Sequence, residues 1–103
     1  MSRGAPKFMI YNLRETYHEL GEYDFRVVLD AKFFNNSHGS SVSIVNPDGT
    51  EIPCNVERWG RKMRCQFRIG ESVPDGVSII KLSLRDSRDR EQKHSVKFWV
   101  IKP

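Results

Sequence analysis

Apolar and polar residues alternate with a period of two along the C-terminal third of the chain, in two runs at residues 76–84 and 94–101. Residues 85–93 between the runs contain no apolar residue, as expected of a solvated turn. Because successive side chains of a strand point to opposite faces, this pattern predicts one long β-hairpin with an apolar inner face. The residues predicted to share that inner face are Ile80, Leu82, Leu84, Val96, Phe98 and Val100.

Three stretches in the first third of the chain predict the elements that precede this hairpin. Residues 7–11 form a short apolar run after a proline, which predicts an edge strand. Residues 12–22 are ambiguous, because the helical spacing of their apolar residues allows either a single helical turn or a plain loop. Residues 23–34 alternate most regularly and predict the longest strand, with Val28 and Phe34 on its outer face.

The middle of the chain predicts a short strand at 42–45 and a second hairpin at 51–69. A two-residue turn at 59–60 would place Cys54 directly opposite Cys65 on the inner face of this hairpin. Their Cα atoms would then lie about 5.5 Å apart, a separation that a disulfide can span. The alternatives are a disulfide and two buried free thiols. We favour the thiols, because a free cysteine behaves as a small core residue.

The length and composition of the chain indicate a single globular domain. The chain has 103 residues, near the commonest domain size, and a hydrophobic fraction of 38% argues against disorder. Residues 1–103 are therefore predicted to form one domain, with residues 1–6 either disordered or left from excision out of a larger protein. No apolar run approaches the roughly 20 residues of a membrane span.

Three local patterns resemble immunoglobulin-like β-sandwich modules, the group that includes bacterial Ig-like repeats, macroglobulin-type domains and filamin-type repeats. They are a Gly-Glu step into the long strand at 21–27, a strand ending in a Pro-x-Gly turn at 42–49, and a proline and glycine before a strand and an aspartate at 73–86. The resemblance implies an all-β, antiparallel, Ig-like β-sandwich of about seven strands. It also implies a non-enzymatic spacer, adhesion or protein-binding module. The sequence leaves the compartment open: cell-surface or secreted if the chain is excised from a larger protein, and otherwise cytoplasmic.

The outer face of the C-terminal hairpin carries three apolar residues, Ile79, Trp99 and Ile101. If they are scattered with the other outward apolar residues, they are unremarkable, because single exposed apolar side chains are common. If they cluster, they form an exposed patch suited to a partner. Tryptophan in particular is enriched at protein interfaces. The sequence therefore predicts a protein-binding module whose partner is another protein or a neighbouring domain of the same chain.

A basic cluster around the predicted turn of the second hairpin supports an alternative function. The chain has a net charge of +4, which permits an acidic partner. The cluster consists of Arg58, Trp59, Arg61 and Arg64. Its guanidinium groups and indole would bind a polyanion or carbohydrate, with the indole stacking on a base or sugar. The simpler interpretation is a solvated face with exposed ion pairs, so binding of nucleic acid or another polyanion is the less favoured function.

The sequence gives little support for catalysis or for a metal site. His18, His38 and His94 fall at unrelated positions in polar surroundings, and no Cys-x-x-Cys motif is present. No nucleophile and base can be paired by a meaningful spacing, and there is no glycine-rich phosphate loop. We therefore expect neither catalytic nor metal-ligating residues, no cofactor, and a protein that is not an enzyme.

Overall fold

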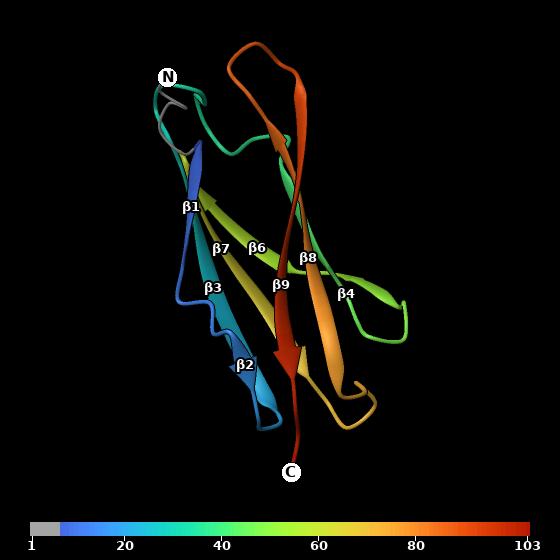
Figure 1. The fold of residues 1–103 in the computed structure, drawn as a ribbon. Coiled ribbons are helices and arrows are strands. Elements are labelled where there is room, and N and C mark those ends of the chain that lie inside the picture. The colour runs from blue at the N-terminus through green and yellow to red at the C-terminus, as the bar shows by residue number, and fades with distance from the viewer. Residues whose placement is uncertain (1–6) are drawn as a thin grey trace, which may run out of the picture.

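The structure, a computed structural model, describes residues 7–103, and the expectation about residues 1–6 lies outside that range. Every regular element within the described range is a β-strand (Figure 1). The strands are β1 (Phe8–Tyr11), β2 (Thr16–Tyr17), β3 (Gly21–Leu29), β4 (Ser41–Val45), β5 (Glu51–Pro53), β6 (Asn55–Trp59), β7 (Lys62–Ile69), β8 (Gly76–Arg85) and β9 (Glu91–Val100).

The strands form two sheets that face each other as the layers of a β-sandwich (Figure 1). The four-stranded sheet has the order β1-β3-β7-β6, and the five-stranded sheet has the order β2-β9-β8-β4-β5. All neighbouring strands run antiparallel except β2 and β9, which run parallel. The predicted all-β sandwich is therefore confirmed. The described strands number nine rather than about seven, because the two short strands β2 and β5 add to the expected set.

The core lies between the sheets and is built from the alternate side chains that each strand directs inward. An aromatic cluster forms its centre, with the ring of Tyr17 5.2 Å from that of Phe98 and 5.5 Å from that of Phe67 between centroids. Edge-to-face packing of this kind adds to the stabilisation from apolar burial. The other large side chains that are fully buried are Phe25, Phe34, Leu29, Met63, Ile80, Leu82 and Leu84.

The predicted C-terminal hairpin is confirmed and is longer than expected. β8 and β9 pair along their full length, from Gly76 opposite Val100 to Arg85 opposite Glu91. The predicted inner face is also confirmed, with Val96 half-buried and the other five residues buried. The turn is only five residues, 86–90, because the polar residues on either side continue the ladder.

The ambiguous stretch 12–22 contains neither a helical turn nor only loop, since it includes the short strand β2. The backbone N–H of Trp99 donates to the Glu15 carbonyl at 2.9 Å, and that of Ile101 donates to the Tyr17 carbonyl at 2.9 Å. These bonds hold β2 against the end of β9. The helical spacing was misleading because Tyr17 alone is buried there, and a strand of two residues has no period to detect.

The strand predicted to be the longest ends earlier than predicted, with nine residues against ten in β8 and in β9, and Phe34 does not face outward. β3 stops at Leu29, and the backbone N–H groups of Phe33 and Phe34 donate to the Asp30 carbonyl at 3.0 and 2.9 Å. The Asp30 side chain also accepts from the backbone N–H of Lys32 at 2.8 Å. This tight turn breaks the two-residue period, so Phe34 enters the core with 0% of its surface exposed. Val28 lies half-buried on the outer face as predicted.

The second predicted hairpin is wrong in its first arm and in its register. The arm divides into β5, which pairs with β4, and β6, which pairs with β7 in the other sheet. Cys54 makes the crossing between the sheets. The observed pairing of β6 and β7 is shifted by two residues, with the turn at 60–61, so Val56 and not Cys54 lies opposite Cys65. Gly60 adopts a φ of 57°, the left-handed conformation that glycine allows without strain.

Candidate interaction surfaces

The outer face of the five-stranded sheet carries a contiguous group of apolar residues near the C-terminal end of β9. Trp99 lies directly opposite Val77 on β8, and Ile79 lies opposite Val45 on β4. Trp99 is 46% exposed and Ile101 48% exposed, whereas the other three are half-buried. We call this group the outer patch; it consists of Val45, Val77, Ile79, Trp99 and Ile101.

Charged and hydroxyl side chains border the outer patch along the same strands. Lys97 lies opposite Ile79, and Lys81 forms an ion pair of 3.4 Å with Glu51. Glu51 also accepts a hydrogen bond of 2.7 Å from the Ser43 hydroxyl. An apolar centre with a polar rim is the usual anatomy of a protein interface.

Sequence reasoning identified three members of the outer patch and missed two, Val77 and Val45. Val77 shares the strand face of Ile79, so its position followed from the alternation already recognised on β8. Val45 required the pairing of β4 with β8, and no pattern within one strand gives the register between strands that are distant in sequence.

The basic cluster does not form one surface. The Arg58 guanidinium turns inward and donates to the Ser40 carbonyl at 2.6 Å, and Arg61 donates to the Leu29 carbonyl at 3.3 Å. Arg64 forms ion pairs with Asp24 at 2.8 Å and Glu57 at 3.2 Å. Trp59, at 59%, is the most exposed large apolar side chain of the described residues.

Each of the three arginines therefore already has an acceptor within the domain. The pKa of the Asp24 carboxyl is lowered mainly by its hydrogen bond to Arg64, as expected for an ion pair that forms in the folded protein. The inward direction of Arg58 had a signal in the sequence, because it continues the face of Cys54 and Val56.

Cys54 and Cys65 are free thiols in the structure. Burial raises the pKa of Cys54 to about 11 and the pKa of Cys65 to about 12. Both side chains are consequently neutral at physiological pH. A neutral, buried thiol reacts slowly as a nucleophile, because the thiolate is the reactive species.

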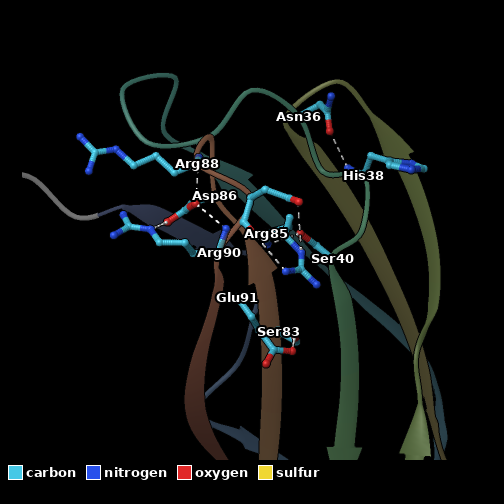
Figure 2. Close-up of polar contacts among 10 residues, drawn as sticks. Asn36, His38, Ser40, Ser83, Arg85, Asp86, Arg88, Arg90 and Glu91 are labelled. Carbon is cyan, nitrogen blue, oxygen red and sulfur yellow. Dashed lines mark hydrogen bonds and ion pairs between the residues drawn. The ribbon is translucent and has the colours of Figure 1, made fainter.

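The turn between β8 and β9 is organised by one carboxylate (Figure 2). Asp86 Oδ1 accepts the backbone N–H groups of Arg88 and Arg90, both at 2.9 Å. Its Oδ2 accepts Arg90 Nε at 3.1 Å and Gln92 Nε2 at 3.0 Å. These donors, the backbone N–H of Arg90 first, lower the pKa of Asp86 far below its usual range. Asp86 thus fixes the backbone of the turn and holds the Arg90 side chain, whereas the Arg88 side chain points away from the network (Figure 2).

An apolar cleft opens between the sheets at the end opposite the β8–β9 turn. Its volume is about 920 Å³, and its walls include Ile44, Ile52, Phe67 and Phe98. The cleft is open because the chain crosses at Cys54 from β5 in one sheet to β6 in the other. The inward-facing side chain of Ile52 is therefore left uncovered. The buried hydroxyl of Ser78 lines it and has no hydrogen-bond partner among the described residues.

The three histidines do not come together. His18 Nδ1 lies 2.9 Å from the Ile101 carbonyl, His38 lies in the β3–β4 connection, and the His94 ring packs edge-on against Phe8 at 4.7 Å. Burial lowers the pKa of His94. Within residues 7–103, no group of three or more His, Cys, Asp or Glu side chains is arranged to hold a metal ion. The same part of the chain contains no helix that could span a membrane.

No protein-family model matches the chain, and no curated protein is significantly similar to it. The proposals below therefore depend on the geometry of the fold and its surfaces.

Proposed function

We propose that the chain is a non-enzymatic, Ig-like interaction module that binds a protein partner or a neighbouring domain through the outer patch. The order β1-β3-β7-β6 against β9-β8-β4-β5 supports the Ig-like assignment, because it corresponds to the A-B-E-D and G-F-C order of such domains, with a further strand beside C. The observation that carries the function is the cross-strand register, which brings apolar residues of three strands together on a solvent-facing surface.

The chemistry of the outer patch favours a protein over a polyanion. Burying Trp99 and its neighbours removes apolar surface from water, which contributes about 25 cal/mol per Å² before the costs of association. The basic cluster offers less to a polyanion, because Arg58, Arg61 and Arg64 would first have to leave acceptors inside the domain. Polyanion or carbohydrate binding at Trp59 remains the alternative function.

The test is site-specific photo-crosslinking of the chain in its native host. A photoreactive aromatic residue at position 99 should give one discrete crosslinked protein, and the product should disappear when Val77 is changed to Lys. The same residue at position 41, on the same sheet face but remote from the outer patch, is the matched control. Equal products at both positions, or none at 99 together with salt-sensitive binding to heparin, would contradict the proposal.

The variant Trp99→Ser separates binding from folding. Because Trp99 faces solvent, we expect its free energy of unfolding to stay within about 0.5 kcal/mol of the wild type in urea titrations. Phe98→Ser, one residue away and buried, is the control that should unfold the domain.

A further inference from the structure

One edge of the five-stranded sheet is open along most of β9. β8 pairs with β9 over its full length on one side, whereas β2 pairs on the other side only with Trp99 and Val100. Among residues 7–103, no strand lies beside residues 91–97 on that side. Figure 1 shows β2 covering only the lower end of β9. Within the described part of the chain, seven residues of strand edge therefore have no partner strand and can pair with another chain.

The backbone groups at this edge can be assigned from the hydrogen bonds at its two ends. The N–H groups of Trp99 and Ile101 point toward β2, and the carbonyl of Arg90 accepts the Asp86 N–H from the β8 side. N–H and C=O groups alternate in direction along a strand, so odd-numbered residues of β9 face the open edge. The residues that present both groups there are Glu91, Lys93, Ser95 and Lys97.

We propose that a second copy of this chain pairs with this edge, β9 against β9 in antiparallel orientation. The two-fold axis passes midway between His94 and its equivalent in the second copy. Glu91 then lies opposite Lys97 of the second copy, and Lys93 opposite its Ser95. By symmetry each pair occurs twice, and all four edge-facing residues exchange backbone hydrogen bonds with the other copy.

The charges of β9 select this register over its neighbours. A shift by two residues in one direction places Lys93 opposite Lys97 of the other copy, and a shift in the other direction places Lys93 opposite its own equivalent. Like charges directly opposite each other destabilise a strand pair, and opposite charges stabilise it. The central register alone pairs Glu91 with Lys97 and places no lysine directly against a lysine.

The length of the open edge agrees with the same register. The edge is bounded by the β8–β9 turn at Glu91 and by β2 at Trp99, so residues 91–97 of an antiparallel copy centred on His94 fill it, and the β8–β9 turn of that copy must bend away before it reaches Thr16 beside Trp99. The outer strands at the other edges are shorter, with four residues in β1, three in β5 and five in β6. β9 is accordingly the edge best suited to a symmetric partner.

Sedimentation equilibrium over a range of concentrations measures the self-association. We expect a monomer–dimer equilibrium for the wild type. Glu91→Lys and Lys97→Glu should each weaken the dimer about tenfold, because each places like charges at both symmetric contacts. The double variant E91K/K97E should restore the dimer. A chain that is monomeric at all concentrations, or a double variant no tighter than the single ones, overturns the proposal.

A proline variant tests the backbone pairing independently of charge. Ser95→Pro removes an N–H that faces the open edge, so the variant should fold and remain monomeric. Val96→Pro removes an N–H bonded to β8 and should unfold by circular dichroism, which checks the assigned directions. Trp99→Ser should dimerise like the wild type, since the outer patch is not part of this contact. A dimer that persists in Ser95→Pro shows that the copies associate elsewhere and overturns the proposal.

Discussion

Two hairpin turns of the sandwich, β6–β7 and β8–β9, are held in opposite ways. The β8–β9 turn is held from within by the carboxylate of Asp86, which accepts hydrogen bonds from its own turn (Figure 2) and from Gln92. The β6–β7 turn is held from outside: the Gly60 carbonyl accepts the Ser37 N–H at 2.6 Å, and the Arg61 carbonyl accepts the Leu29 N–H at 2.8 Å. The first turn is held mainly by its own residues, with one further hydrogen bond from the Ser87 N–H to the Phe33 carbonyl, whereas the second depends on Leu29 at the end of β3 and on Ser37 in the segment that follows.

The difference shows why a side chain far from a turn can decide its conformation. Phe34 anchors the segment after β3 in the core, and that segment contacts both turns, through Ser37 to Gly60 and through the Phe33 carbonyl to the Ser87 N–H at 2.9 Å. Loss of the anchor should affect the externally held turn more than the self-contained one.

The largest expected effect is that of Phe34→Ala. Removing a fully buried phenyl ring leaves a cavity and should lower the free energy of unfolding by about 3–5 kcal/mol, measured by urea titration. Hydrogen exchange should show greater loss of protection at the β6–β7 turn than at the β8–β9 turn. Phe33→Ala, at a half-buried position in the same segment, is the control and should cost less. Equal loss at both turns would contradict the comparison.

The next effect is that of Asp86→Asn, which acts on the self-contained turn. The new amide N–H₂ cannot accept from Arg90 Nε or Gln92 Nε2, so the variant should be less stable at pH 7. The lowered pKa of Asp86 stabilises the folded state above its ordinary pKa near 3.9, and this contribution is lost as pH falls through the folded value. In urea titrations, the difference in stability between wild type and variant should therefore narrow from pH 7 to pH 3, and it should close only at a pH below the lowered pKa of folded Asp86. Asp89→Asn, at an exposed side chain, should change little.

The smallest effect is that of Gly60→Ala in the externally held turn. A Cβ there meets no atom within 4 Å, so the cost is conformational and should be roughly 1–2 kcal/mol in thermal or urea unfolding. Gly60→Asn should cost less, because asparagine tolerates a positive φ. If both substitutions lower the free energy of unfolding equally, the positive φ of residue 60 is not the cause of the loss.

The sequence predicted the parts of the fold that local alternation determines. The C-terminal hairpin was predicted correctly because each arm carries its own period and the polar stretch between them contains the turn, although its outer residues continue the strands. The register of β6 and β7 was not predicted correctly, because it is set by hydrogen bonds from Leu29 and Ser37, more than twenty residues earlier in the chain. The burial of Phe34 was missed because a turn at Asp30 interrupts an apparently regular strand.

The candidate interaction surfaces show the same difference between features that strand periodicity predicts and features that depend on contacts between distant segments. The outward direction of Trp99 and Ile79 follows from strand periodicity, whereas the contribution of Val45 depends on the pairing of β4 with β8. The basic cluster looked continuous in sequence because adjacent residues were taken to share a surface. In the structure, Arg58 and Arg64 point to opposite sides of the sheet, since the former reaches Ser40 and the latter Asp24.

The pairing of β2 with β9 has a consequence for the order in which the domain assembles. Thr16 lies opposite Trp99, so two of the most distant parts of the chain must meet to form the shortest strand pair. Closing so long a loop costs conformational entropy. Two residues of β-ladder offset that cost only after the surrounding sheets have formed. During synthesis β2 is made early, and it can pair only after β9, the last strand, has been made. Tyr17 is therefore expected to complete the aromatic centre of the core in a late step, observable as a late tyrosine signal in stopped-flow refolding.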